Sequence, residues 1–69
     1  ISLTAVENQI YDFLQDDEIK LVCVNIPDDK KGEKIVLVIT KQIDNLKQDL
    51  LKSGINPLYI PSDIEVIEN

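Results

Sequence analysis

Two apolar runs flank a turn-forming segment in the first half of the chain, and this pattern constrains the fold most. Residues 19–26 (IKLVCVNI) and 34–40 (KIVLVIT) are apolar at both odd and even positions. Alternate side chains of a strand point to opposite faces, so both runs predict strands with apolar surface on each face. The segment between them contains a proline, two aspartates and a glycine, which are typical turn residues. The sequence therefore predicts an antiparallel hairpin whose first strand is central in a sheet.

A helix is predicted over residues 2–14, before the hairpin. Its apolar residues recur at steps of three and four, which is the spacing of one helix face: Leu3, Val6, Ile10, Phe13 and Leu14. Ser2 is a suitable N-cap, and Thr4 with Glu7 fits a capping box, so two starting points remain open.

A second helix is predicted over residues 43–53, after the hairpin. Its apolar face comprises Ile43, Leu46, Leu50 and Leu51, and Gly54 stands where a left-handed C-cap is expected. The NPLYIP segment that follows is expected to be extended or irregular, because residues before proline avoid the helical region. Residues 64–67 suggest a last short strand.

The predicted order is α-β-β-α-β, an α+β fold with a small three-stranded mixed sheet. We expect the third strand beside the first, in the order 2-1-3, with two helices packed on one face. The other apolar face of the sheet has no predicted cover within the 69 residues, which suggests further elements or a partner.

Composition excludes several classes of function. The net charge of −6 disfavours nucleic acid as a partner. The chain has no histidine and no arginine, and Cys23 is its one cysteine, so the usual triads, zinc sites and bidentate phosphate contacts are excluded. If the chain takes part in chemistry, other groups supply most of it.

The tip of the predicted hairpin is the candidate binding segment. Its residues are Lys30, Lys31, Gly32, Glu33 and Lys34. The first interpretation is a solvated loop in which the glycine supplies backbone freedom, since no GxxxxGK[ST] phosphate-binding pattern is present. The alternative is a small basic patch that faces an acidic partner or a nucleotide.

Other residues whose side chains could react or bind ligands are predicted to have structural roles. Cys23 is expected to be a small buried residue, and Glu7 a capping or helix-surface carboxylate. The acidic pairs and runs at 16–18 and 28–29 are expected to be solvated, because calcium loops need a different ligand spacing. Both tyrosines, Tyr11 and Tyr59, are expected to pack half-buried.

The ordered motifs resemble the small C-terminal domain of adenylate-forming enzymes, the acyl-CoA synthetase and luciferase superfamily. The first motif is the helix opening [IV]-S-x-x-x-[IV]-E, here Ile1, Ser2, Val6 and Glu7. A strand and the "PD…KGE" pattern follow, here Pro27, Asp28, Lys31, Gly32 and Glu33. A "P-x-x-I" pattern completes the series, here Pro61 and Ile64. The stretch SGINPLYIPSDIEVI resembles one branch, the bifunctional acyl-acyl carrier protein synthetase / 2-acylglycerophosphoethanolamine acyltransferases.

This resemblance implies that residues 1–69 are a single fragment of such a domain. In the family, a large N-terminal domain binds ATP, magnesium and a fatty acid and forms an acyl-adenylate. The small domain then rotates and assists thioester formation, in this branch on acyl carrier protein, and a separate acyltransferase domain acylates a lysophospholipid. The resemblance further implies a bacterial parent enzyme on the cytoplasmic side, associated with the inner membrane.

No catalytic residue is assigned within the chain. The family's catalytic lysine comes from a Gly-Lys loop that is expected beyond Asn69, so none of the seven lysines takes its role. The fragment alone is expected to be inactive and to bind neither cofactor nor metal. Two alternatives remain: a free-standing α+β protein-interaction module, or the same domain of a plain acyl-CoA synthetase.

Overall fold

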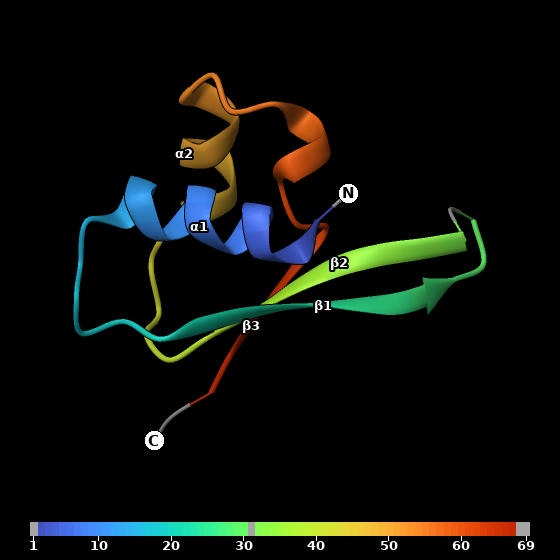
Figure 1. The fold of residues 1–69 in the computed structure, drawn as a ribbon, viewed down its shortest axis with the longest axis horizontal. Coiled ribbons are helices and arrows are strands. Elements are labelled where there is room, and N and C mark those ends of the chain that lie inside the picture. Colours follow the sequence, from blue (N-terminus) through green and yellow to red (C-terminus); the bar gives the residue numbers. More distant parts are fainter. Residues whose placement is uncertain (1, 31, 68–69) are drawn as a thin grey trace.

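Two helices and three strands follow each other in the predicted order. The structure, a computed structural model, describes residues 2–30 and 32–67. Its elements are α1 (Leu3–Leu14), β1 (Leu21–Asp28), β2 (Gly32–Ile39), α2 (Leu46–Lys52), a 3₁₀ helix (Pro57–Tyr59) and β3 (Asp63–Val66) (Figure 1). This confirms the α+β class with the order α-β-β-α-β and a mixed sheet.

The strand order is 1-2-3, so the expected order 2-1-3 is wrong. β1 and β2 form the predicted antiparallel hairpin, in a register that runs from Leu21 opposite Ile39 to Asp28 opposite Gly32. β3 lies beside β2 and parallel to it, with Val36 opposite Asp63. β2 is therefore the central strand, and β1, which was expected to be central, is at the edge.

The composition of the two hairpin strands explains this arrangement. Leu37 is 0% exposed on the helix-covered face of β2, and Val36 is only 4% exposed on the other face, because β2 has a strand on each side. β1, in contrast, has Asn25 opposite Ile35 and Pro27 opposite Glu33, and a proline cannot donate a ladder hydrogen bond. Pro27, which the sequence predicts to be a turn residue, lies within β1 opposite Glu33, and a proline at this place indicates an edge strand.

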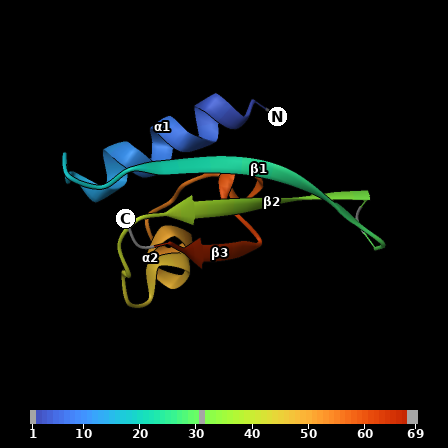
Figure 2. The same cartoon turned by 90° about the horizontal axis from the view of Figure 1, so that it is seen from below.

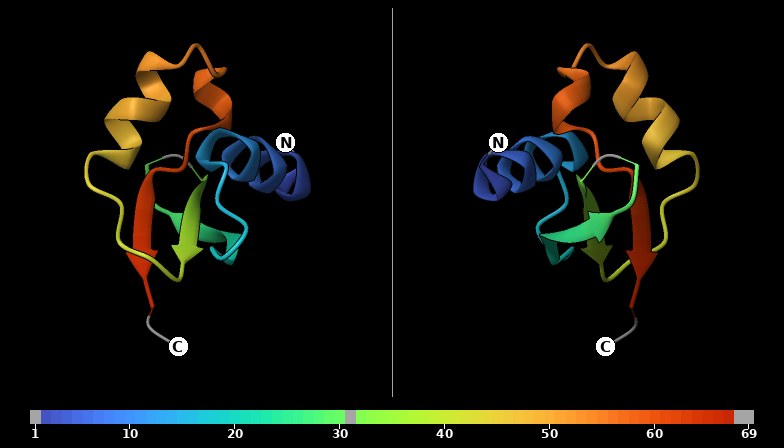
Figure 3. Two further views of the ribbon diagram at one scale, coloured as in Figure 1. Left: turned by 90° about the vertical axis from the view of Figure 1, so that its left-hand side faces the viewer. Right: turned by 90° about the vertical axis from the view of Figure 1, so that its right-hand side faces the viewer.

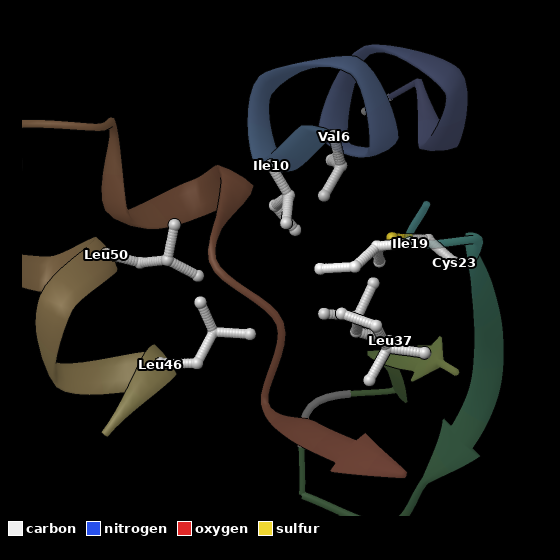
Figure 4. Close-up of a cluster of buried hydrophobic side chains, with 8 residues drawn as sticks. Val6, Ile10, Ile19, Cys23, Leu37, Leu46 and Leu50 are labelled. Atoms are coloured by element: carbon white, nitrogen blue, oxygen red, sulfur yellow. The ribbon is translucent and has the colours of Figure 1, made fainter. Parts of the chain in front are cut away.

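Both helices cover the same face of the sheet, as predicted (Figures 1 and 3). α1 lies over β1, and α2 lies on the same side of the sheet. Between the helices and the sheet lies one apolar core (Figure 4), formed by Val6, Ile10, Ile19, Cys23, Leu37, Ile39, Leu46 and Leu50. Burial of these side chains is the main source of stability for so short a chain.

α1 agrees closely with the prediction, whereas α2 is shorter than predicted. Ser2 is the N-cap of α1, since its Oγ accepts a hydrogen bond from the Ala5 N–H at 3.3 Å. α2 begins at Leu46, because Asn45 adopts a left-handed conformation (φ 60°) that a continuing helix cannot include. The predicted left-handed Gly54 is confirmed, with φ 87° after the end of α2.

The segment after α2 is more regular than expected. Asn56 Oδ1 accepts a hydrogen bond from the Leu58 N–H at 3.0 Å, and this contact caps the N-terminus of the 3₁₀ helix Pro57–Tyr59. Pro61 is then fully buried where the chain enters β3. Within the part of the chain that the structure describes, no helix is long and apolar enough to span a bilayer.

Candidate functional site

The hairpin tip brings together the residues that the sequence singled out. Asp28 lies opposite Gly32 in the ladder, and Asp29 and Lys30 form a turn at the end of β1, with Lys30 exposed. Gly32 has φ 82°, and a Cβ there would meet nothing within 4 Å. The glycine is therefore needed for its backbone conformation, and no neighbouring protein group requires the missing side chain. Lys31 lies outside the described residues.

Lys34 is engaged with a residue that sequence reasoning did not connect to it. Its Nζ lies 2.7 Å from Asp63 Oδ2, which links β2 to β3. The hydrogen bond to Asp63 raises the pKa of Lys34. The expected order 2-1-3 kept β3 away from β2 and so concealed this pair. Within the candidate basic patch, Lys34 thus supports the sheet, and Glu33 is exposed beside it.

Cys23 is buried in the core, as predicted. Its exposed fraction is 3%, and burial, together with the nearby Glu7, raises the pKa of the thiol to about 11. A thiol that holds its proton so tightly is a poor nucleophile at neutral pH. Cys23 therefore has a packing role.

Glu7 has a role that its sequence context did not reveal. The residue was expected to cap the helix or to face solvent. Its Oε2 instead accepts a hydrogen bond from the backbone N–H of Cys23 at 2.8 Å, in a partly buried position. This contact ties α1 to β1 over 16 residues of sequence, and helical periodicity alone gives no signal for it.

The acidic residues after α1 form a turn. Asp16 Oδ1 accepts a hydrogen bond from the Glu18 N–H at 3.0 Å, and Lys41 Nζ lies 3.3 Å from Asp16 Oδ2. The pKa of Asp16 is lowered most by the hydrogen bond from the Glu18 backbone and further by the contact with Lys41. Over residues 2–30 and 32–67, no group of three or more potential metal ligands comes together.

The two tyrosines differ in exposure. The Tyr11 hydroxyl donates a hydrogen bond to Asp17 at 3.4 Å, and the side chain is 39% exposed. Tyr59 is partly buried against the core, as predicted. The two rings are components of the fold, with no arrangement typical of a stacking platform.

One depression lies between α1 and the segment after α2. Its volume is about 450 Å³, and it is lined by Asn8, Gln9, Asp12, Phe13, Ser53 and Ile55. These residues include no cation for a phosphate and no nucleophile paired with a base. The lining of this depression is therefore not typical of a phosphate-binding or catalytic site.

The face of the sheet opposite the helices is the most distinctive surface. We call it the outer face and define it by Val22, Val24, Ile26, Val36, Val38 and Ile67. Val22 is 46% exposed and Ile67 is 50% exposed, although both are apolar. A shallow hollow of about 130 Å³ lies between their side chains. Neighbouring apolar side chains on one face are typical of a contact surface.

Comparison with known proteins finds similarity among solved structures. No protein-family model matches the sequence, and no curated protein matches it. Among solved structures, the chain is similar to the crystal structure of an acyl-CoA synthetase (AMP-forming)/AMP-acid ligase II-like protein from Dyadobacter fermentans. The match has a TM-score of 0.76 at 23% sequence identity and covers 100% of this chain. The chain has the fold of one part of that protein.

The extent of the match matters as much as its quality. The chain spans 21% of the length of the Dyadobacter protein. At this level of identity the likeness shows the fold, and the activity of the larger protein does not transfer with it.

Proposed function

We propose that this chain is part of the small C-terminal domain of an AMP-forming, acyl-activating ligase. The observation that carries the proposal is the structural match, which includes every element of this chain and about a fifth of a ligase-like protein. The ordered motifs from Ser2 to Ile64 support it independently. The chain would act as a mobile cap on the large N-terminal adenylating domain.

The more specific proposal is a ligase that transfers fatty acids to acyl carrier protein and supplies lysophospholipid acylation. The stretch SGINPLYIPSDIEVI supports this branch. Its residues have defined structural roles, since Gly54 ends α2 in the left-handed region and Pro61 is buried before β3. Partners would be acyl carrier protein and, through the parent enzyme, fatty acid and lysophospholipid at the cytoplasmic side of a bacterial inner membrane.

The described residues do not fit MgATP as a ligand of this chain alone. Lys34 is paired with Asp63, the depression between α1 and the segment after α2 is lined by no cationic side chain, and the described carboxylates form no metal cluster. In this proposal ATP and magnesium therefore bind to the parent enzyme, and no residue of this chain is assigned as its catalytic lysine. No reaction step is assigned to the 69 residues.

The test uses the parent protein encoded with this chain. Purified parent protein, ATP, magnesium and a fatty acid are combined with either acyl carrier protein or free CoA, and AMP and thioester are measured. We expect AMP release with acyl carrier protein as the preferred acceptor. Equal or better transfer to CoA would favour a plain acyl-CoA synthetase, and no fatty-acid-dependent AMP would contradict the proposal.

A second candidate function is a free-standing interaction module, which the exposed outer face favours. The reading frame separates the two, because a module needs no adenylating domain upstream of Ile1. ATP titration against the labelled 69-residue chain provides a further check: we expect no saturable binding, and clear binding would contradict the proposed role as a cap.

A further inference from the structure

The depression between α1 and the segment after α2 combines hydrogen-bonding side chains with apolar ones. In Figure 2, α1 lies on the β1 side of the sheet and α2 on the β3 side, and the chain after α2 returns toward α1. The residues that line the depression come from α1 and from this returning segment: Asn8, Gln9, Asp12, Phe13, Ser53 and Ile55. Side chains four residues apart on a helix are neighbours, so Asn8 lies next to Asp12 and Gln9 next to Phe13. The lining therefore places polar groups beside an aromatic ring.

The polar side chains that α1 contributes are available to a ligand. Within the part of the chain that the structure describes, no hydrogen bond or ion pair engages the Asp12 carboxylate or the side-chain amides of Asn8 and Gln9. Asp12 accepts a hydrogen bond from the Gln15 side chain at 2.6 Å, but through its backbone carbonyl. The side-chain oxygens of these three residues are thus open acceptors on one wall of the depression.

The charge of the lining and its aromatic ring both favour a cation. Asp12 is negatively charged, and none of the residues that line the depression is cationic; Lys52, which precedes Ser53, is exposed and does not line it. Phe13 is 37% exposed, and the face of an accessible aromatic ring attracts a cation. The net charge of −6 adds a long-range field of the same sign. An anionic ligand is disfavoured on each of these grounds.

A guanidinium group suits this lining better than an ammonium group. It is planar and has five N–H donors, so it can stack on an aromatic ring while its edge binds a carboxylate and further acceptors. The aliphatic stem of an arginine can pack on Ile55, which is partly buried against the core. The chain itself contains no arginine, so neither the chain nor a second copy can supply this group. Arginine is also among the residues that most often anchor contacts between different proteins.

We propose that the depression between α1 and the segment after α2 binds an arginine side chain of a partner protein. Asp12 forms the ion pair with the guanidinium, Phe13 provides the stacking surface, and the side-chain oxygens of Asn8 and Gln9 accept further N–H groups. This inference goes beyond the proposed ligase function and does not depend on it.

The test titrates the 69-residue chain with N-acetyl-arginine N-methylamide at low salt and follows backbone amide shifts by NMR. The blocked termini leave the guanidinium as the one charge of the probe. The corresponding citrulline derivative is a neutral control of nearly the same shape, and the lysine derivative tests a plain ammonium. We expect saturable shifts at the lining residues, with the citrulline probe weaker by roughly tenfold or more and the lysine probe weaker by roughly threefold. Equal binding of the arginine probe and either other probe, or no saturable shifts at the lining residues, would overturn the proposal.

A matched pair of variants tests the role of the carboxylate. Asp12→Asn removes the charge and keeps the shape, and Asp29→Asn makes the same change at the exposed hairpin tip. Both positions are exposed, so the fold should be retained. We expect Asp12→Asn to weaken binding of the arginine probe by roughly fivefold or more and Asp29→Asn to leave it nearly unchanged. Equal effects of the two substitutions would indicate a general charge effect and would overturn the site.

A second pair of variants tests the aromatic ring. Phe13→Leu removes the ring and keeps an apolar side chain, whereas Phe13→Tyr keeps the ring. We expect Phe13→Leu to weaken binding of the arginine probe by roughly two- to fivefold and Phe13→Tyr to retain it. Undiminished binding by Phe13→Leu, in a chain whose NMR spectrum shows the native fold, would contradict the stacking role.

Discussion

The two faces of the β1–β2 hairpin both carry apolar side chains but differ in how far these are exposed to solvent. On the covered face, Cys23 and Leu37 lie opposite each other and are 3% and 0% exposed. On the outer face, Val24 lies opposite Val36, and Val24 is 36% exposed. The two rows come from the same strands, and the difference arises because both helices pack on one side.

This difference shows that apolar character along a strand does not by itself mark the core. Burial on the covered face stabilises the fold, whereas the outer face contributes less and is available for contacts. Substitutions at matched positions on the two faces should therefore have very different consequences.

The largest effect is expected from Leu37→Ala on the covered face. Removing this fully buried side chain should lower the free energy of unfolding by about 3 kcal/mol or more. A domain of this length has only about 3–10 kcal/mol in total. The variant should be largely unfolded in urea concentrations that leave the unmodified chain folded, as measured by circular dichroism.

Val22→Ala on the outer face is the matched control. It removes apolar atoms from a side chain that is 46% exposed, so the loss should be below about 1 kcal/mol. Comparable losses in the free energy of unfolding for Leu37→Ala and Val22→Ala would contradict the distinction between a stabilising covered face and an exposed outer face.

A smaller effect is expected at the end of α2, one of the two helices that make the faces different. Gly54→Ala places an alanine at φ 87°, and although the added Cβ has open space, the conformation should cost about 1 kcal/mol. Gly54→Asn should cost less, because asparagine tolerates the left-handed region better. Urea titration distinguishes the two, and equal stability of all three chains would argue against a strained cap.

The smallest effect is expected from Lys34→Ala, which removes the ion pair with Asp63. The pair is exposed to solvent, so salt screens it. Thermal unfolding should show a slight decrease in Tm at low salt that disappears at high salt, with Lys30→Ala at the hairpin tip as the control. A decrease as large as that of Gly54→Ala, at both salt concentrations, would show that Lys34 contributes more than a surface pair.

Sequence patterns predicted the elements better than their arrangement. Periodicity located α1 and the hairpin because each depends on neighbouring residues. Strand order depends on which surfaces bury each other, and here the decisive signals were the apolar residues on both faces of β2 and Pro27 within β1. The α2 start was misplaced because Asn45 takes a left-handed conformation that its residue type permits but does not require.

The candidate site was predictable only in part. The hairpin, its glycine and the burial of Cys23 follow from local sequence. The Lys34–Asp63 pair and the bond from Cys23 to Glu7 span 29 and 16 residues of sequence, so they depend on packing that no local pattern specifies.

Thiol reactivity tests most directly whether one face is closed and the other open. Cys23 is the native probe of the covered face, and Val22→Cys in a Cys23→Ala chain places a thiol on the outer face. At pH 8, burial and a pKa of about 11 for Cys23 should make its reaction with a chromogenic disulfide reagent about 100-fold slower than in the urea-unfolded chain, since an ordinary thiol has a pKa of about 8.5. The thiol at position 22 should react at nearly the same rate in the folded and unfolded chains. Equal protection of the two thiols would contradict the account.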